Sequence, residues 1–144
     1  MNNTSSNKTQ ESTFEEIEHT ADWALRVRGK TAPALFRNAA FGMLQLIQAK
    51  PESTRSKKRN IELEAFDNES LLVTWLEELL FHIETRNVTF LNIHIEHLDE
   101  THLSAVLEET PLVDLKKEIK AVTYHNLEII STEEGLETTV VFDV

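Results

Sequence analysis

Apolar and polar residues alternate strictly in several short runs of the chain. Trp23, Leu25 and Val27 occupy every second position of one run, with Arg26 between two of them. Such alternation is typical of a strand that buries one face. Alternation or enrichment in β-branched residues predicts about six strands, at residues 23–28, 61–65, 91–95, 103–107, 119–130 and 138–142. We expect Gly135 to supply a positive φ in the turn before the last strand.

Two further segments have helical periodicity. Residues 36–47 and 71–83 place apolar side chains at steps of three and four, which predicts two helices with buried faces. Thr31 is expected to precede the first helix and Pro51 to stop it, while Asn68 is expected to cap the second. Residues 107–118 are interpreted as a glycine-free connection between strands.

The predicted order is strand, helix, strand, helix and then four strands. This order is typical of a single α+β domain with an antiparallel-rich sheet, and we expect both helices on one face of it. The domain is predicted over residues 13–144. Residues 1–12 are almost wholly polar and are predicted to form a disordered tail.

Charge and composition then narrow the class of protein. Lys and Arg total 14 against 25 for Asp and Glu, a formal net charge of -11, so we expect neither stable direct nucleic-acid binding nor membrane binding. No run approaches the ~20 apolar residues of a membrane span, and the amino end is too polar for a secretory signal. The chain has no cysteine, which excludes disulfides and thiolate metal sites and suits the cytoplasm. The basic residues 55–59 are interpreted as a solvated loop.

Two aspartates stand beside predicted strand ends. Asp22 precedes the first strand, and Asp143 lies next to the α-carboxylate of Val144. Together these oxygens suit a hard divalent cation, Ca²⁺, Mg²⁺ or Mn²⁺. The alternative is that Asp22 is a turn residue and that Asp143 frays with the terminus.

Other polar residues offer weaker candidate chemistry. Lys120 is predicted on a strand, near an aromatic ring or an acid, or else as a surface lysine. Glu78 falls near the apolar stripe of the second helix and is either an acid at the edge of the core or a surface glutamate. His82 is expected to be solvated, and His19 is notable only for its closeness to Asp22. No residue setting predicts a catalytic nucleophile with its base.

Four blocks of this sequence resemble the archease family. They are His19-Thr20-Ala21-Asp22, Trp75-Leu76-Glu77-Glu78-Leu79-Leu80, Lys120-Ala121-Val122-Thr123-Tyr124-His125 and Val141-Phe142-Asp143-Val144. Their order and spacing match the family from about residue 14 to the last residue. Each block alone is weak evidence for the resemblance, but the four blocks together are specific to the family.

The resemblance implies an accessory protein and not a free-standing enzyme. Archeases assist the RtcB-type RNA ligase, which joins 2′,3′-cyclic-phosphate or 3′-phosphate ends to 5′-hydroxyl ends in tRNA splicing and RNA repair. They promote guanylylation of the ligase's active-site histidine and multiple turnover. By this resemblance Asp22, Asp143 and the carboxylate of Val144 would hold the metal. Lys120, and with less support Glu78 and His19, would contribute to activation.

Two other functions remain open at this point. One is a chaperone-like modulator of a tRNA-modifying methyltransferase, which predicts binding to that enzyme and no effect on ligation. The other is a small metal-dependent hydrolase, which needs a pocket with a poised general base.

Overall fold

The computed structural model describes residues 13–18 and 22–144. Within these residues the chain forms two helices and nine strands. Their order is β1 (Phe14–Glu18), β2 (Asp22–Gly29), α1 (Ala32–Ile47), β3 (Lys50–Pro51), β4 (Lys57–Glu64), α2 (Asn68–Arg86), β5 (Val88–Leu98), β6 (His102–Asp114), β7 (Ala121–Thr123), β8 (Ile130–Thr132) and β9 (Gly135–Asp143). The predicted disordered tail and His19 lie outside the described residues.

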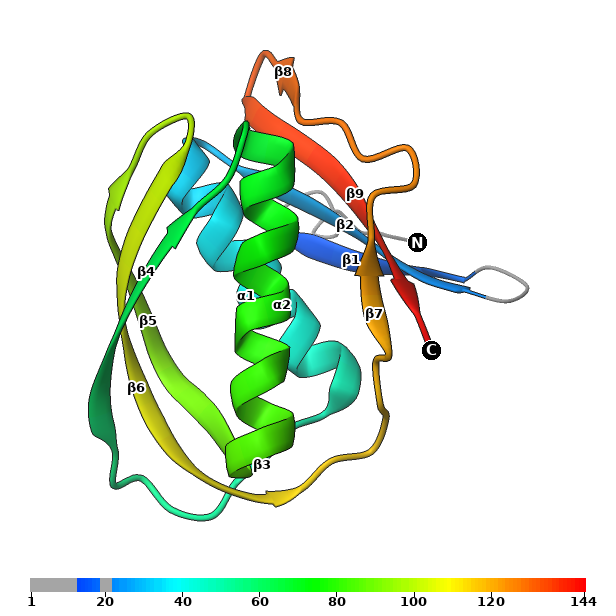
Figure 1. Ribbon diagram of the computed structural model, residues 1–144. Coiled ribbons are helices and arrows are strands. Elements are labelled where there is room, and N and C mark those ends of the chain that lie inside the picture. The colour runs from blue at the N-terminus through cyan, green and yellow to red at the C-terminus, as the bar shows by residue number, and fades with distance from the viewer. Residues whose placement is uncertain (1–12, 19–21) are drawn as a thin grey trace, which may run out of the picture.

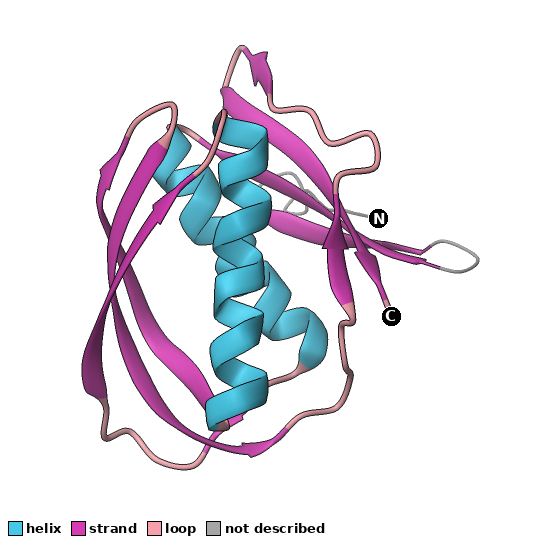
Figure 2. Cartoon of the chain, viewed as in Figure 1, coloured by secondary structure: helices cyan, strands magenta, loops and turns pink. Residues whose placement is uncertain are grey.

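The strands form two antiparallel sheets. One has the order β1-β2-β9-β7 with β8 also paired to β9, and the other pairs β3, β4 and β5 with β6. Both helices lie between the sheets (Figures 1 and 2), with α1 against β2 and β5 and α2 against β4, β5 and β7. This confirms the predicted α+β class.

Both helices lie on one face of each sheet, as expected, but two sheets and not one cover them. Buried residues extend around most of the circumference of each helix, beyond the predicted stripe. In α1 they are Leu35, Phe36, Ala39, Ala40, Gly42, Met43, Leu44, Leu46 and Ile47. A helix that is apolar on most sides must be covered on most sides, and two sheets provide that cover.

The helix ends depart in detail from the prediction. Thr31 caps α1 as expected, since its hydroxyl accepts a hydrogen bond from the Ala34 amide at 3.3 Å. The cap of α2 is Asp67 and not Asn68, because the Asp67 carboxylate accepts from the Ser70 amide at 2.8 Å. The helix α1 ends at Ile47, before Pro51.

The strands differ from the sequence prediction in four places. The predicted strand at residues 119–130 is broken, because Asn126 has a φ of 53° and residues 124–129 turn between β7 and β8. The strand β6 continues through most of the expected connection, to Asp114. The strands β1 and β3 were not predicted, so the observed order has one more strand before each helix than expected. Gly135 has a φ of 136° at the start of β9, as expected.

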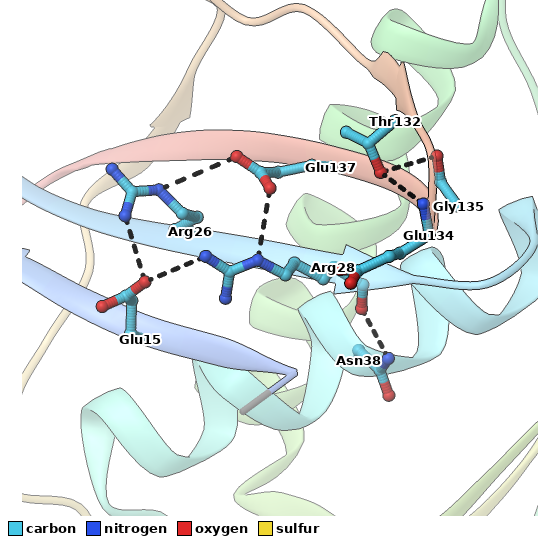
Figure 3. A network of polar contacts seen from close by, with 8 residues as sticks. All are labelled: Glu15, Arg26, Arg28, Asn38, Thr132, Glu134, Gly135 and Glu137. Carbon is cyan, nitrogen blue, oxygen red and sulfur yellow. Dashed lines mark hydrogen bonds and ion pairs between the residues drawn. The ribbon is translucent and has the colours of Figure 1, made fainter. Parts of the chain in front are cut away.

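The core fills the space between the sheets around the two helices. Trp75 of α2 is fully buried, and its indole Nε1 donates to the backbone oxygen of Phe36 at 2.9 Å. This bond joins the two helices inside the core. On the other face of the first sheet, Arg26 and Arg28 lie between Glu15 and Glu137 (Figure 3). Arg26 Nη1 is 3.1 Å from Glu15 Oε1, and Arg28 Nε is 3.2 Å from Glu137 Oε1.

Candidate metal centre

Three strands of the first sheet meet at the end that carries the predicted metal ligands. In the antiparallel register Asp143 of β9 is opposite Asp22 of β2 and, on its other side, opposite Ala121 of β7. The Lys120 amide donates to the Asp143 backbone oxygen at 2.7 Å. Figure 1 shows the C-terminal end of β9 between these neighbours. Residues from the beginning, the end and a late loop of the chain are therefore adjacent.

Packing inside the domain holds this sheet end in place. Phe142 is fully buried, its partner Val122 is 4% exposed and its other partner Trp23 is partly buried. Because successive side chains of a strand alternate between faces, anchoring Phe142 inward directs Asp143 away from the core. Asp143 is exposed, and Val144 is 37% exposed.

Two of the three predicted ligand positions are directly opposite each other in the backbone register. Directly opposed residues of antiparallel strands have Cα atoms roughly 4.5–5.5 Å apart, so the Cα atoms of Asp22 and Asp143 are close neighbours. The side chain of Asp22 is outside the described atoms. Among the described side chains there is no group of three or more His, Asp or Glu spaced to hold a metal ion. The three-ligand site at Asp22, Asp143 and Val144 stays a prediction.

Lys120 lies beside the outer surface of α2. It lines a hollow of about 210 Å³ together with Glu77, Leu80, Phe81, Glu84 and Ala121. Phe81 is 56% exposed and both glutamates are exposed. The hollow thus combines an exposed cation, two acids and an aromatic ring. Lys120 is an exposed surface lysine that precedes β7, so it does not lie on the strand predicted for it.

Glu78 belongs to a different part of α2 and does not line that hollow. Its Oε2 lies 3.0 Å from Nε2 of His82, one helical turn away, and its side chain is 33% exposed. The expectation that His82 is solvated was wrong, since it is only 8% exposed. The His82 Nδ1 atom is buried and has no hydrogen-bond partner among the described residues.

One cation near the sheet end was missed by the sequence analysis. The ammonium of Lys117 lies 3.3 Å from the ring centroid of Trp23, a cation–π contact. The amides of Lys116 and Lys117 both donate to the Ile47 backbone oxygen, at 3.0 and 3.3 Å, which ties this segment to the end of α1. No local pattern predicts this contact, because Lys117 lies in a segment without alternation.

No helix in residues 13–18 and 22–144 is long and apolar enough to cross a bilayer. The fold and site define a small α+β domain whose two antiparallel sheets enclose two helices, with exposed carboxylates at one sheet end. Residues 14–144 match the model of the family described as "Archease protein family (MTH1598/TM1083)". The chain belongs to the archease family.

Individual relatives agree with this assignment. The protein archease of Methanosarcina barkeri is 36% identical over 139 residues, covering 91% of this chain and 95% of the relative. The solution structure of Methanobacterium thermoautotrophicum protein 1598 is 27% identical with a TM-score of 0.67, covering 92% of this chain and 99% of that one. A Thermotoga maritima crystal structure, described as an archease and possible chaperone, is similar in fold, with a TM-score of 0.67 at 22% identity over 90% of this chain and 96% of that one.

Proposed function

We propose that this protein is an accessory factor that activates an RtcB-type RNA ligase in tRNA splicing and RNA repair. It promotes the metal-dependent guanylylation of the ligase and its multiple turnover. The activating surface is the sheet end where Asp22, Asp143 and the carboxylate of Val144 together hold a divalent cation. The chain itself catalyses no reaction.

The observation that carries the proposal is the register of β2 with β9. It pairs Asp22 with Asp143, one residue before Val144, although these residues lie at opposite ends of the domain. Membership of the archease family supports the proposal that the partner is an RtcB-type RNA ligase. The exposure of Asp143 and Val144 supports an acidic surface that is accessible to a second protein.

Electrostatics supply a reason for the association. Sites that transfer nucleotides are basic, and this chain carries a formal net charge of -11, so complementary fields favour encounter with such a site. A divalent ion held by the sheet end would supply positive charge against a nucleoside triphosphate. The chain's own carboxylates position that ion and leave the nucleotide-binding residues to the ligase.

The test is a guanylylation assay of the cognate ligase with the wild-type protein and with Asp143→Asn. We expect Asp143→Asn to lose stimulation and to weaken Ca²⁺ binding measured by calorimetry. Asp114→Asn is the matched control, because it removes one exposed aspartate at another strand end. Full stimulation by Asp143→Asn would refute the metal site. Equal loss in both variants would refute its location.

The same guanylylation assay tests the other residues that are predicted to contribute to activation. Lys120→Ala should retain Ca²⁺ binding and lose stimulation, since Lys120 is exposed beside the sheet end and its side chain is not a cation ligand. Glu78→Gln and His19→Ala are expected to have smaller effects. Binding of the protein to a tRNA methyltransferase, with no change in guanylylation, would instead support the chaperone-like alternative.

A further inference from the structure

A second region of the molecule, remote in sequence from the acidic sheet end, forms a basic cavity. Its volume is about 770 Å³, and its lining includes Ser53, Arg55, Lys57, Arg86, Glu109 and Thr110. The lining comes from the loop before β4, the end of α2 and the strand β6. This volume is in the range of about 300–1,000 Å³ that is typical of small-molecule sites.

A buried acid organises the cations of this cavity. The Glu109 side chain is 2% exposed, and it accepts hydrogen bonds at 2.7 Å from Arg59 Nε, Arg86 Nη1 and Arg86 Nη2. The bidentate contact from Arg86, helped by Arg59, lowers the pKa of Glu109 to about 2 against the opposing effect of burial. Glu109 is therefore ionised at neutral pH and holds both guanidinium groups in fixed orientations.

Several cationic nitrogen atoms in and beside this cavity form no ion pair within the described residues. Arg59 uses only its Nε for Glu109, and its terminal nitrogens have no partner among the described residues. The side chains of Arg55 and Lys57 likewise make no hydrogen bond or ion pair within the described part of the chain. By contrast, Arg26 is paired with acids on the first sheet (Figure 3).

The lining of the cavity carries an excess of positive charge. Three cations, Arg55, Lys57 and Arg86, outnumber two acids, Glu52 and Glu109. Arg59 lies outside the lining and adds a further positive charge beside Glu109. A phosphate monoester carries about -1.5 to -2 charges at neutral pH and offers three acceptor oxygens. Guanidinium and ammonium groups are the side chains that recognise such oxygens.

We infer that this cavity binds a phosphate-bearing small molecule, with Arg55 and Lys57 of its lining as the donors. The site is independent of the proposed metal centre and of ligase activation. Its ligand is either free phosphate or a nucleotide. For a nucleotide, Val88 and Pro111 of the same lining supply apolar contact for the rest of the molecule.

The experiment is an NMR titration of the full chain with inorganic phosphate, with ionic strength held constant by chloride. We expect saturable shifts of the backbone amides at residues 53–57 and 109–110. An acetate titration should give no saturable shift at these amides. Tighter binding of AMP than of phosphate identifies a nucleotide as the ligand, and equal binding identifies phosphate; either result supports the site.

Two neighbouring lysines provide matched variants. Lys57 lines the cavity, whereas Lys58 is the next residue of β4, is opposite Glu108 and is not in the lining. Both are exposed and removal of either changes the net charge equally. Lys57→Ser should weaken phosphate binding about tenfold, the loss of one charge-assisted contact. Lys58→Ser should change it less than about twofold.

Three results would overturn the inference. They are an absence of saturable phosphate binding, shifts confined to another region of the chain, and equal weakening by the two lysine variants. The last result would mean that the positive field alone attracts anions, without a built site. Both substituted side chains are exposed and make no ion pair within the described residues, so loss of folding does not obscure the comparison.

Discussion

The buried carboxylate of Glu109 makes a quantitative prediction about stability. We consider Glu109→Gln, which keeps the size of the side chain and removes its charge. In the wild type, contacts with Arg86 and Arg59 lower the pKa of Glu109 from 4.5 to about 2. At about 1.4 kcal/mol per pKa unit, this difference corresponds to about 3 kcal/mol of native-state stability. The two arginine side chains are 32% and 35% exposed, so solvent screening reduces the expected loss to about 2–3 kcal/mol.

The sign of the pH dependence follows from the lowered pKa. The ionised form is favoured in the folded state, so the stabilisation is complete above about pH 5 and is lost as the pH falls toward the folded-state pKa. Protonated Glu109 is neutral, as glutamine is. The difference in stability between wild type and Glu109→Gln should therefore fall to less than half of its neutral-pH value by about pH 3.

Urea denaturation followed by circular dichroism and tryptophan fluorescence at several pH values measures this difference. Subtracting the variant from the wild type cancels the titration of the other carboxylates. Glu108→Gln is the control, because it removes a charge from the adjacent, half-buried residue, and it should stay within about 0.5 kcal/mol of wild type. Equal stability of Glu109→Gln and wild type, or a difference that does not vary with pH, would refute the reasoning.

Three further substitutions test the packing and the helix ends by thermal or urea unfolding. Gly29→Ala places a Cβ atom 2.7 Å from the Leu35 Cα atom, and because backbone cannot easily move aside, we expect a loss of about 2–3 kcal/mol. Thr31→Ala removes the cap bond to the Ala34 amide and should cost about 1 kcal/mol; no change would show that the 3.3 Å contact contributes nothing. His82→Phe removes a buried ring nitrogen that has no partner in the described residues. It should stay within about 1 kcal/mol of wild type, and a larger loss would mean that its contact with Glu78 is a strong one.

The local spacing of apolar residues was sufficient to predict both helices and most of the strands. The three-and-four periodicity around Phe36 and Leu76 and the alternation at Trp23 and Leu103 depend only on which face of each element is buried. Where the pattern was ambiguous, the prediction failed. β-Branched residues at positions 119–130 indicated one strand, but Asn126 breaks it in the folded chain.

The sequence pattern of β6 already marks Glu109, the acid that binds Arg59 and Arg86, as unusual. Leu103, Ala105 and Leu107 occupy inward positions of β6, and Glu109 is the next residue in that alternation. An acid at an inward position requires a charged partner. That partner could not be predicted, because Arg86 ends a helix and Arg59 lies on another strand.

The sequence alone determined the acidic character of the chain, its α+β class and the oxygen ligands available for a cation. The tertiary structure alone decided the pairing of Asp22 with Asp143, the placement of both helices between two sheets and the convergence of cations around Glu109. The physical reason is that side-chain periodicity is local, whereas strand register is set by burial across the whole domain. A slip of one residue between β2 and β9 would separate the two aspartates and turn Phe142 away from the core.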